Sequence, residues 1–246
     1  MAAIVLTGAG GDIGRAIAVR CATAGAPLVL VGRDPGRLAA TRHAVAGGAA
    51  AVLCMDGDAS DTRFVSRVAD VVEATWGGLR ALVNNAGAAL PARGVQETSD
   101  EELEDAVSNN YYTAFRMTRG LLPLLLRRGG GCIVNIASIA ATIGMPKVSA
   151  YAAAKAATIA LTRSTAVEYG SSGLRCNCLC PGTIETDMTS GFLADPVRRR
   201  GARDATPLRR LGHADDVAAA VMFLLSSEAS FLTGAVIPID GGRCAW

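Results

Sequence analysis

The sequence is poor in aromatic residues and in net charge, and both shortages limit the partners that the chain can have. Only 4% of its 246 residues are aromatic, and 24 basic against 22 acidic side chains leave a formal net charge of +2. Nucleic-acid surfaces concentrate positive charge, and those that bind single strands also stack bases on aromatic rings. The composition therefore argues against a nucleic-acid-binding protein.

Long apolar runs are also missing. Stretches such as LLPLLL at 121–126 are far shorter than the about 20 residues that a membrane-spanning helix needs. The opening stretch AAIVLTGAG at 2–10 has the pattern of a buried strand that runs into a glycine turn, not of a cleavable leader. We therefore expect a cytoplasmic protein with no membrane partner.

The seven cysteines lack the spacing of a metal site or a disulfide framework. Cys176, Cys178 and Cys180 alternate in CNCLC, so in a strand they share one face, where thiols pack as small apolar groups. Neither a CxxC pair nor a nearby histidine completes a tetrahedral zinc site. The odd count and the expected compartment favour free thiols, and we expect no metal.

Short apolar runs alternate with longer amphipathic segments along the chain. The runs lie at 3–7, 27–32, 50–55, 79–85, 132–138, 174–180 and 235–240, and the helical segments include 13–24, 60–76, 100–126, 151–170 and 214–226. This alternation predicts an α/β fold, in which residues 1–246 form a single Rossmann-type, doubly wound domain. Its seven-stranded parallel sheet would carry helices on both faces.

The segment at about 182–207 interrupts this rhythm with mixed polar, apolar and arginine-rich sequence. It follows the sixth predicted strand, and doubly wound proteins bind their ligands at the carboxyl ends of their strands. We therefore expect it to be a lid over the substrate.

The stretch TGAGGDIG at 7–14 joins the first predicted strand to the first predicted helix. Its glycines permit positive φ and a close approach of the backbone to a pyrophosphate, whose charge is favoured by exposed amides at a helix start. Glycine-rich turns are common in α/β proteins. Its place after the first strand of a βαβ unit, however, predicts a dinucleotide site.

Lysine is scarce as well, because arginine supplies all of the 24 basic residues except Lys147 and Lys155. Lys155 follows Tyr151 by four residues in YAAAK, so the two lie on one face of a helix. A phenol has a pKa of about 10, too high for efficient proton exchange at neutral pH, and a nearby ammonium favours the phenolate. We therefore expect Lys155 to lower the pKa of Tyr151 at an acid/base site, and to hold a ribose as an arginine could not readily do.

With these motifs the chain resembles the short-chain dehydrogenase/reductase family, whose glycine pattern is TGxxxGxG. Thr7, Gly8 and Gly14 match it, whereas Asp12 stands where the family has its middle glycine. A carboxylate is repelled by a pyrophosphate. We therefore expect Asp12 to turn back and cap the amides of the first helix.

Two further residues carry the resemblance into the catalytic site. Ser138 lies 13 residues before Tyr151, which is the family's spacing, and Asn110 lies in NNYYTAFRMTRGLLP, which resembles the helix that carries the family's asparagine. The resemblance implies that Ser138 binds the substrate oxygen, that Tyr151 exchanges its proton, and that Asn110 helps to hold a water chain from Lys155 to solvent. The implied catalytic residues are Asn110, Ser138, Tyr151 and Lys155.

The resemblance also implies cofactor contacts in several motifs. NNAG at 84–87 would brace the sheet and line the cofactor, GDASD at 57–61 would contact adenine, and CPGTIETDM at 180–188 would begin the lid and reach the nicotinamide. Asp58 in the second motif could instead cap the next helix. The implied cofactor-binding residues are Gly8, Asp12, Ile13, Gly14, Arg33, Asp58, Asn85, Ala86, Gly87, Tyr151, Lys155, Pro181, Gly182, Ile184 and Thr186.

The end of the second predicted strand, VGRDPGRL, bears on the choice of dinucleotide. Members of the family that prefer NAD usually place an acid there, whereas this chain has Gly32 followed by Arg33, whose guanidinium can pair with a 2′-phosphate. Asp34 precedes Pro35, an arrangement typical of a helix cap. We therefore expect NADP(H) to be favoured over NAD(H).

The carboxyl-terminal third is most similar to the 3-oxoacyl-carrier-protein reductase branch, in PLRRLGHADDVAAAVMFLLSSEASFLTGAVIPIDGG at 207–242, although the loop at 87–100 departs from that branch. The resemblance implies a homotetramer and a small-molecule or acyl-thioester substrate. An acidic acyl carrier protein, or the phosphates of coenzyme A, could bind to a set of arginines. Ordinary exposure to solvent explains these arginines equally well: 127, 128, 198, 199, 200, 203, 209 and 210. Apolar residues are expected to border a hydrophobic ketone: Ala88, Ile139, Ile143, Met145, Ile184, Met188 and Phe192.

The function expected from these residues is an NADPH-dependent ketoreductase acting on a 3-oxoacyl-type or other hydrophobic ketone. A second possibility is an NAD(P)-dependent secondary-alcohol dehydrogenase acting on a hydroxysteroid, a sugar or a specialised metabolite. A third is a dinucleotide-binding sensor without catalysis. Such a sensor would have no reason to combine the four catalytic residues.

Overall fold

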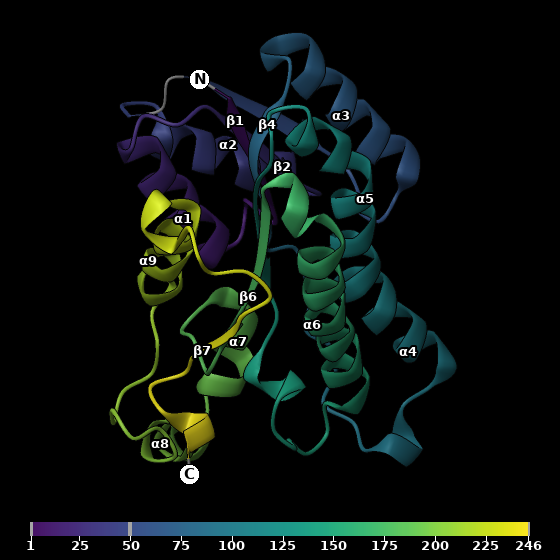
Figure 1. Ribbon diagram of the computed structural model, residues 1–246. Helices are drawn as coiled ribbons and strands as arrows, with labels where there is room; N and C mark the ends of the chain where they lie inside the picture. Colours follow the sequence, from purple (N-terminus) through teal and green to yellow (C-terminus); the bar gives the residue numbers. More distant parts are fainter. Residues whose placement is uncertain (1, 49–50, 246) are drawn as a thin grey trace.

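The computed structural model describes residues 2–48 and 51–245, and its strands form one parallel sheet (Figure 1). In the described residues the strand order is β3-β2-β1-β4-β5-β6-β7, which is the predicted doubly wound arrangement with seven strands. The strands are β1 (Ala3–Thr7), β2 (Leu28–Gly32), β3 (Val52–Asp56), β4 (Leu79–Asn84), β5 (Gly131–Ile136), β6 (Leu174–Pro181) and β7 (Val236–Ile239).

Helices cover both faces of the sheet. They are α1 (Asp12–Thr23), α2 (Pro35–Val45), α3 (Thr62–Trp76), α4 (Asp100–Val107), α5 (Thr113–Leu126), α6 (Ser149–Tyr169), α7 (Asp187–Leu193), α8 (Pro196–Asp204) and α9 (Ala214–Leu225). Helices α1, α2 and α9 pack on one face, and α3, α5 and α6 pack on the other, so two apolar clusters sandwich the strands (Figure 1). Strand β1 is buried along its whole length because both of its faces are covered.

The predicted element boundaries hold to within a few residues, with three differences. Strand β5 ends at Ile136, so Ser138 lies beyond it, and Ala50 of the predicted third strand falls outside the described residues. The predicted helix at 100–126 contains a π-helical turn at Ser108–Tyr112. The expected lid at about 182–207 folds as the two short helices α7 and α8.

Buried amides link the middle strands. Asn84 Nδ2 on β4 donates to Asn135 Oδ1 on β5 at 2.8 Å, and Asn135 Nδ2 donates to Thr162 Oγ1 on α6 at 2.8 Å. These bonds compensate the burial of polar groups in an otherwise apolar layer. They hold α6, which carries Tyr151 and Lys155, at a set position against the sheet.

The cysteines are free thiols, and Cys176, Cys178 and Cys180 are fully buried, as their alternation predicts. Within the described ranges no three His, Cys, Asp or Glu side chains are placed to hold a metal ion. No helix in the described part of the chain is long and apolar enough to cross a bilayer.

Candidate active site

The carboxyl ends of β1, β4, β5 and β6 meet at one edge of the sheet, and the chain crosses from one face to the other between β1 and β4. In open parallel sheets such a switch point leaves a crevice for a ligand. The glycine turn, the NNAG segment, Ser138 and the start of the lid all follow these strands. The topology therefore collects the residues predicted for the site at one edge.

The glycine turn is built for close backbone approach. Gly8 has φ 63°, and a Cβ there would lie 2.9 Å from the Ala86 Cα atom, so glycine is required. Thr7 Oγ1 accepts hydrogen bonds from the backbone N–H groups of Asn85 and Ala86 at 3.1 and 3.0 Å, which joins this turn to NNAG. Helix α1 begins after Gly11, which provides no side-chain cap, so its first amides suit the pyrophosphate of a dinucleotide.

Asp12 corrects one prediction. Its carboxylate does not cap α1 but accepts a hydrogen bond from the backbone N–H of Asp187, the first residue of lid helix α7, at 2.8 Å. Arg37 completes this contact, since its Nε donates to the Gly10 carbonyl oxygen at 3.0 Å and its Nη2 pairs with Asp187 at 2.6 Å. The physical reason is that α7 presents an unpaired N-terminal amide to the carboxylate. We call Asp12, Arg37 and Asp187 the lid latch.

Arg33 is exposed at the end of β2, and its Nη1 donates to Asn109 Oδ1 at 3.0 Å, a partner that sequence reasoning missed. Asp34 caps α2 by accepting from the Arg37 N–H at 3.0 Å, which confirms that prediction. The Asp58 carboxylate accepts from the Ser60 N–H at 2.8 Å, while the cap of α3 is supplied by a different residue, Asp61. Capping of the next helix therefore does not explain Asp58.

Asn110 is buried in the π-helical turn, where it binds the loop after NNAG. Its Oδ1 accepts from the Ala88 N–H at 3.1 Å, and its Nδ2 donates to the Ala88 carbonyl oxygen at 3.1 Å. A Cβ on Gly87 would lie 2.8 Å from Asn110 Oδ1 and 3.0 Å from Lys155 Nζ, so a glycine lets these two side chains approach. π-Helical turns often occur at functional sites, and only the structure reveals this one.

Ser138, Tyr151 and Lys155 lie together beside Gly87. The Ser138 side chain is near enough to the Tyr151 phenol to lower its pKa, and Lys155 Nζ lies 5.8 Å from the centroid of the Tyr151 ring. Lys155 is only 4% exposed, and its Nζ donates to the Ile136 carbonyl oxygen at 3.0 Å. The structure therefore brings the three residues of the predicted acid/base site into one cluster.

The protonation of this cluster differs from the prediction. Burial raises the pKa of the Tyr151 phenol above its ordinary value; the Ser138 side chain opposes this, and the neighbouring Cys180 adds to it. Burial also lowers the pKa of Lys155 to about 8. The predicted lowering of the Tyr151 pKa by Lys155 is therefore wrong here, because desolvation of the phenolate is the largest influence on that pKa and Lys155 is not among the groups that shift it. Tyr151 keeps its proton at neutral pH and can donate it.

The segment expected to form the lid follows β6 directly. Pro181 ends β6, the Gly182 N–H donates to the Ile239 carbonyl oxygen at 3.0 Å, and Thr186 is the N-cap residue of α7. Ile184 is only 4% exposed and belongs to the core, so its backbone rather than its side chain is left for a cofactor.

The predicted apolar border of the substrate site divides in two. Ile139, like Ile184, is buried in the core and does not line an open site, which corrects the expectation for both residues. Met145, Met188 and Phe192 are 40%, 52% and 47% exposed. Period-two apolar patterning does not distinguish a side chain that packs inward from one that faces a ligand.

Known proteins share this arrangement of residues and strands. Residues 8–243 match the family described as Enoyl-(Acyl carrier protein) reductase. The chain is 36% identical over 250 residues to levodione reductase from Leifsonia aquatica, covering 98% of this chain and 94% of that protein. It is 34% identical over 239 residues to 3-oxoacyl-(acyl-carrier-protein) reductase from Escherichia coli (strain K12), covering 97% and 95%.

The solved structures agree with the sequence relatives. The crystal structure of levodione reductase matches with a TM-score of 0.95 at 35% identity, covering 99% of this chain and 98% of that chain. The relatives are named reductases of carbonyl compounds, and the residues above fit a nicotinamide dinucleotide, so this chain is an NAD(P)-dependent oxidoreductase that acts on ketones or secondary alcohols. It belongs to the short-chain dehydrogenase/reductase family.

Proposed function

We propose that the chain is an NADP(H)-dependent ketoreductase of the cytoplasm whose substrate is a hydrophobic or 3-oxoacyl-type ketone. The observation that carries the proposal is that Ser138, Tyr151 and the buried Lys155 form one cluster at the edge of the sheet where the glycine turn lies. A bound nicotinamide dinucleotide supplies the hydride that reduces the carbonyl carbon, or accepts it in the reverse direction.

The residues of the chain divide the remaining work. Ser138 donates a hydrogen bond to the substrate oxygen and stabilises the negative charge that develops there. Tyr151 gives its proton to that oxygen, since its raised pKa keeps the phenol protonated at neutral pH. Lys155 holds the ribose and offers positive charge to the phenolate that remains, and Asn110 holds the loop at Ala88 against α6 and supports proton resupply.

The dinucleotide would be held by the predicted backbone and side-chain groups. Gly8, Ile13 and Gly14 would contact the pyrophosphate, and Asn85, Ala86 and Gly87, which hydrogen bonds join to the glycine turn, would line the middle of the crevice. Asp58 would face the adenine, and Pro181, Gly182, Ile184 and Thr186 would close over the nicotinamide. Asp12 belongs instead to the lid latch.

The preference for NADP(H) rests on Arg33 and has a direct test. We expect Arg33→Ala to raise the KM for NADPH by about tenfold, the loss of one charge-assisted hydrogen bond, and to leave the KM for NADH nearly unchanged. Steady-state kinetics with both cofactors measure this, with Arg42→Ala on the following helix α2 as the control. Equal changes for the two cofactors would refute a contact with the 2′-phosphate.

The lid latch predicts a change in lid opening. Removal of a capping carboxylate costs about 1 kcal/mol, so Asp12→Ala should open the lid roughly fivefold more often. Trypsin reports this opening through the arginines of α8, which become cleaved faster, whereas Asp12→Asn keeps an acceptor oxygen and should change the rate less. An Asp12→Ala protein cleaved at the wild-type rate would show that the latch does not hold the lid.

Substrate class is best resolved by a screen with both cofactors. Exposed Met188 and Phe192 on α7, and exposed Met145, favour an apolar substrate, and the related 3-oxoacyl and levodione reductases suggest thioesters and free ketones as probes. Faster turnover of carrier-protein or coenzyme A thioesters would support the 3-oxoacyl assignment. Preference for a secondary alcohol would instead favour the dehydrogenase alternative, and binding without turnover of any compound would favour the sensor.

The assembly and partner proposals have different support. A homotetramer is proposed from the family resemblance at 207–242, and light scattering would measure it. Most of the arginines suggested for an acidic carrier already have carboxylate partners: Arg127 with Glu73, Arg198 with Asp195, Arg199 with Glu185, Arg203 with Asp204 and Arg210 with Asp216. Docking of an acyl carrier protein would therefore compete with these ion pairs.

A further inference from the structure

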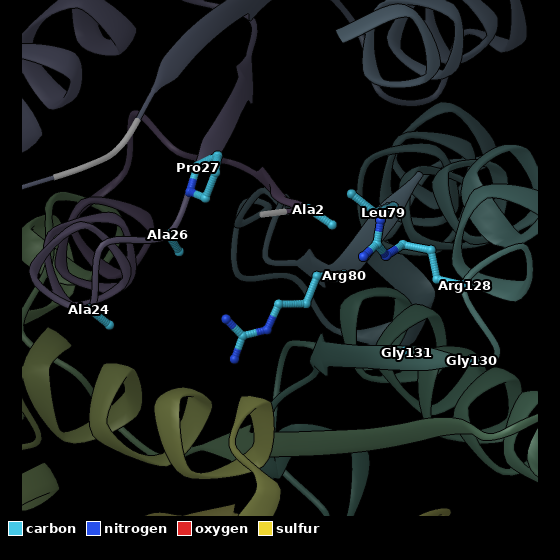
Figure 2. A pocket seen from close by; sticks show the side chains of 9 residues that line it. All are labelled: Ala2, Ala24, Ala26, Pro27, Leu79, Arg80, Arg128, Gly130 and Gly131. Carbon is cyan, nitrogen blue, oxygen red and sulfur yellow. The ribbon is translucent and has the colours of Figure 1, made fainter. Parts of the chain in front are cut away.

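A cavity of about 350 Å³ lies at the end of the sheet opposite the active site (Figure 2). Its walls come from the segments before β1, β2 and β5 and from the start of β4, all of them at the amino ends of strands. Figure 2 shows the Arg80 side chain extending toward Ala24 and Ala26 on one side of the cavity, and the Arg128 side chain beside Leu79 on the other. Among the described residues, none that lines this cavity is acidic.

Arg80 is an unexpected residue at its position. Strand β4 lies in the middle of a parallel sheet covered on both faces, where strands are normally continuous apolar runs, and its other residues are all buried. Arg80 is exposed and opens onto the cavity. The register between β1 and β4 skips Arg80, since Ala3 pairs with Leu79 and Ile4 with Ala81, and this irregularity lets the side chain leave the sheet for the cavity.

Neither guanidinium at the cavity has a partner within residues 2–48 and 51–245: Arg80 and Arg128 form no ion pair and no side-chain hydrogen bond there. The adjacent Arg127, by contrast, pairs with Glu73. Two like charges that share a cavity without a carboxylate attract an anion. The field of Arg80 also reaches inward: burial raises the pKa of the Cys132 thiol to about 11, and the charge of Arg80 is among the groups that oppose that rise.

The glycines at the start of β5 are required by close packing. Gly130 has φ 108°, which L-residues rarely adopt, and a Cβ on Gly131 would lie 2.8 Å from the Arg80 carbonyl oxygen. The remaining wall is lined mainly by alanines, a proline and a leucine, whose small or apolar side chains offer no competing charge. The volume is at the low end for small-molecule sites, which excludes a whole dinucleotide.

We propose that this cavity binds a phosphate group, either free or carried on a small molecule, through Arg80 and Arg128. Guanidinium groups match the oxygens of phosphate in bidentate geometry, and their charge complements a dianion. The site lies outside the proposed ketoreductase chemistry, because the catalytic residues are at the opposite edge of the sheet.

Isothermal titration with inorganic phosphate and with glycerol 3-phosphate tests the proposal. The full chain is first saturated with NADP⁺ or NAD⁺, so that its dinucleotide site does not take up the probe. One site is expected, with affinity that falls as salt rises. Tighter binding of glycerol 3-phosphate would assign the site to a phosphate ester, and equal binding of both probes would assign it to the phosphate group alone.

Three variants make the result specific. Arg80→Gln and Arg128→Gln should each weaken binding about tenfold, the value of one charge-assisted contact, while Arg127→Gln should not. Circular dichroism checks folding, and if Arg80→Gln does not fold, the exposed Arg128→Gln decides alone. The proposal is overturned if neither probe binds, if Arg128→Gln binds like wild type, or if only an acidic carrier protein binds this face. Turnover should be unchanged in all three variants. A negative result for phosphate binding would therefore not contradict the proposed ketoreductase function.

Discussion

Tyr151→Phe is expected to lower kcat by about 10²- to 10⁴-fold, the usual contribution of a positioned acid. The substitution removes only the phenol hydroxyl, on which Ser138 acts, and leaves the ring beside Lys155. Cofactor binding should persist, because the glycine turn and NNAG are untouched. Fluorescence titration with NADPH and steady-state turnover of a ketone found in the substrate screen measure the two effects separately.

The control for this result lies on the same helix. Tyr169→Phe removes a hydroxyl at the other end of α6 and should leave kcat unchanged. A Tyr151→Phe protein with wild-type kcat would eliminate this phenol as the proton donor. Loss of cofactor binding together with turnover would instead show that Tyr151 acts by holding the dinucleotide.

Lys155→Arg and Lys155→Met are expected to lower kcat by about 10²-fold or more, comparable to the loss of one preorganised charge donor. Lys155 Nζ is confined between the Ile136 carbonyl oxygen and Gly87, and a planar guanidinium is too large for that space. Methionine fits it but offers no charge to the phenolate and no donor to the ribose. Steady-state kinetics and cofactor titration of both variants test this.

The Lys155→Met substitution should lower kcat without lowering the stability of the protein. Burial lowers the pKa of Lys155 to about 8, which means that the folded chain disfavours the ammonium. An apolar side chain of similar length removes that penalty, so the free energy of unfolding in urea should be equal or higher. Lys147→Arg, at the other lysine, which is exposed, should change neither activity nor stability. A Lys155→Arg protein with wild-type kcat would contradict the catalytic role proposed for Lys155.

The α/β architecture could be predicted because its signals are local. The apolar strands, the cap at Asp34 and the four-residue spacing of Tyr151 and Lys155 depend only on neighbours within a turn or two. The strand ends also predicted which residues share an edge, since parallel strands place their carboxyl ends together. The π-helical turn at Asn110 has no such local pattern and could not be predicted from the sequence.

The wrong predictions for Asp12, Ile139 and Ile184 have one physical origin, which is contact between segments distant in the chain. Asp12 accepts from an N–H 175 positions away, so its role depended on where the lid helix came to rest. Ile139 and Ile184 are equally apolar whether they face a ligand or the core, and only packing placed them in the core.

The sequence by itself determined the order of strands and helices, the glycine turn and the one lysine placed beside a tyrosine. Only the tertiary structure decided how protons are held in the site, because the burial of Tyr151 and Lys155 depends on the sheet, the loop at Gly87 and the neighbouring strand β6 packing around them. Desolvation is a property of that assembled surrounding and of no single stretch of chain.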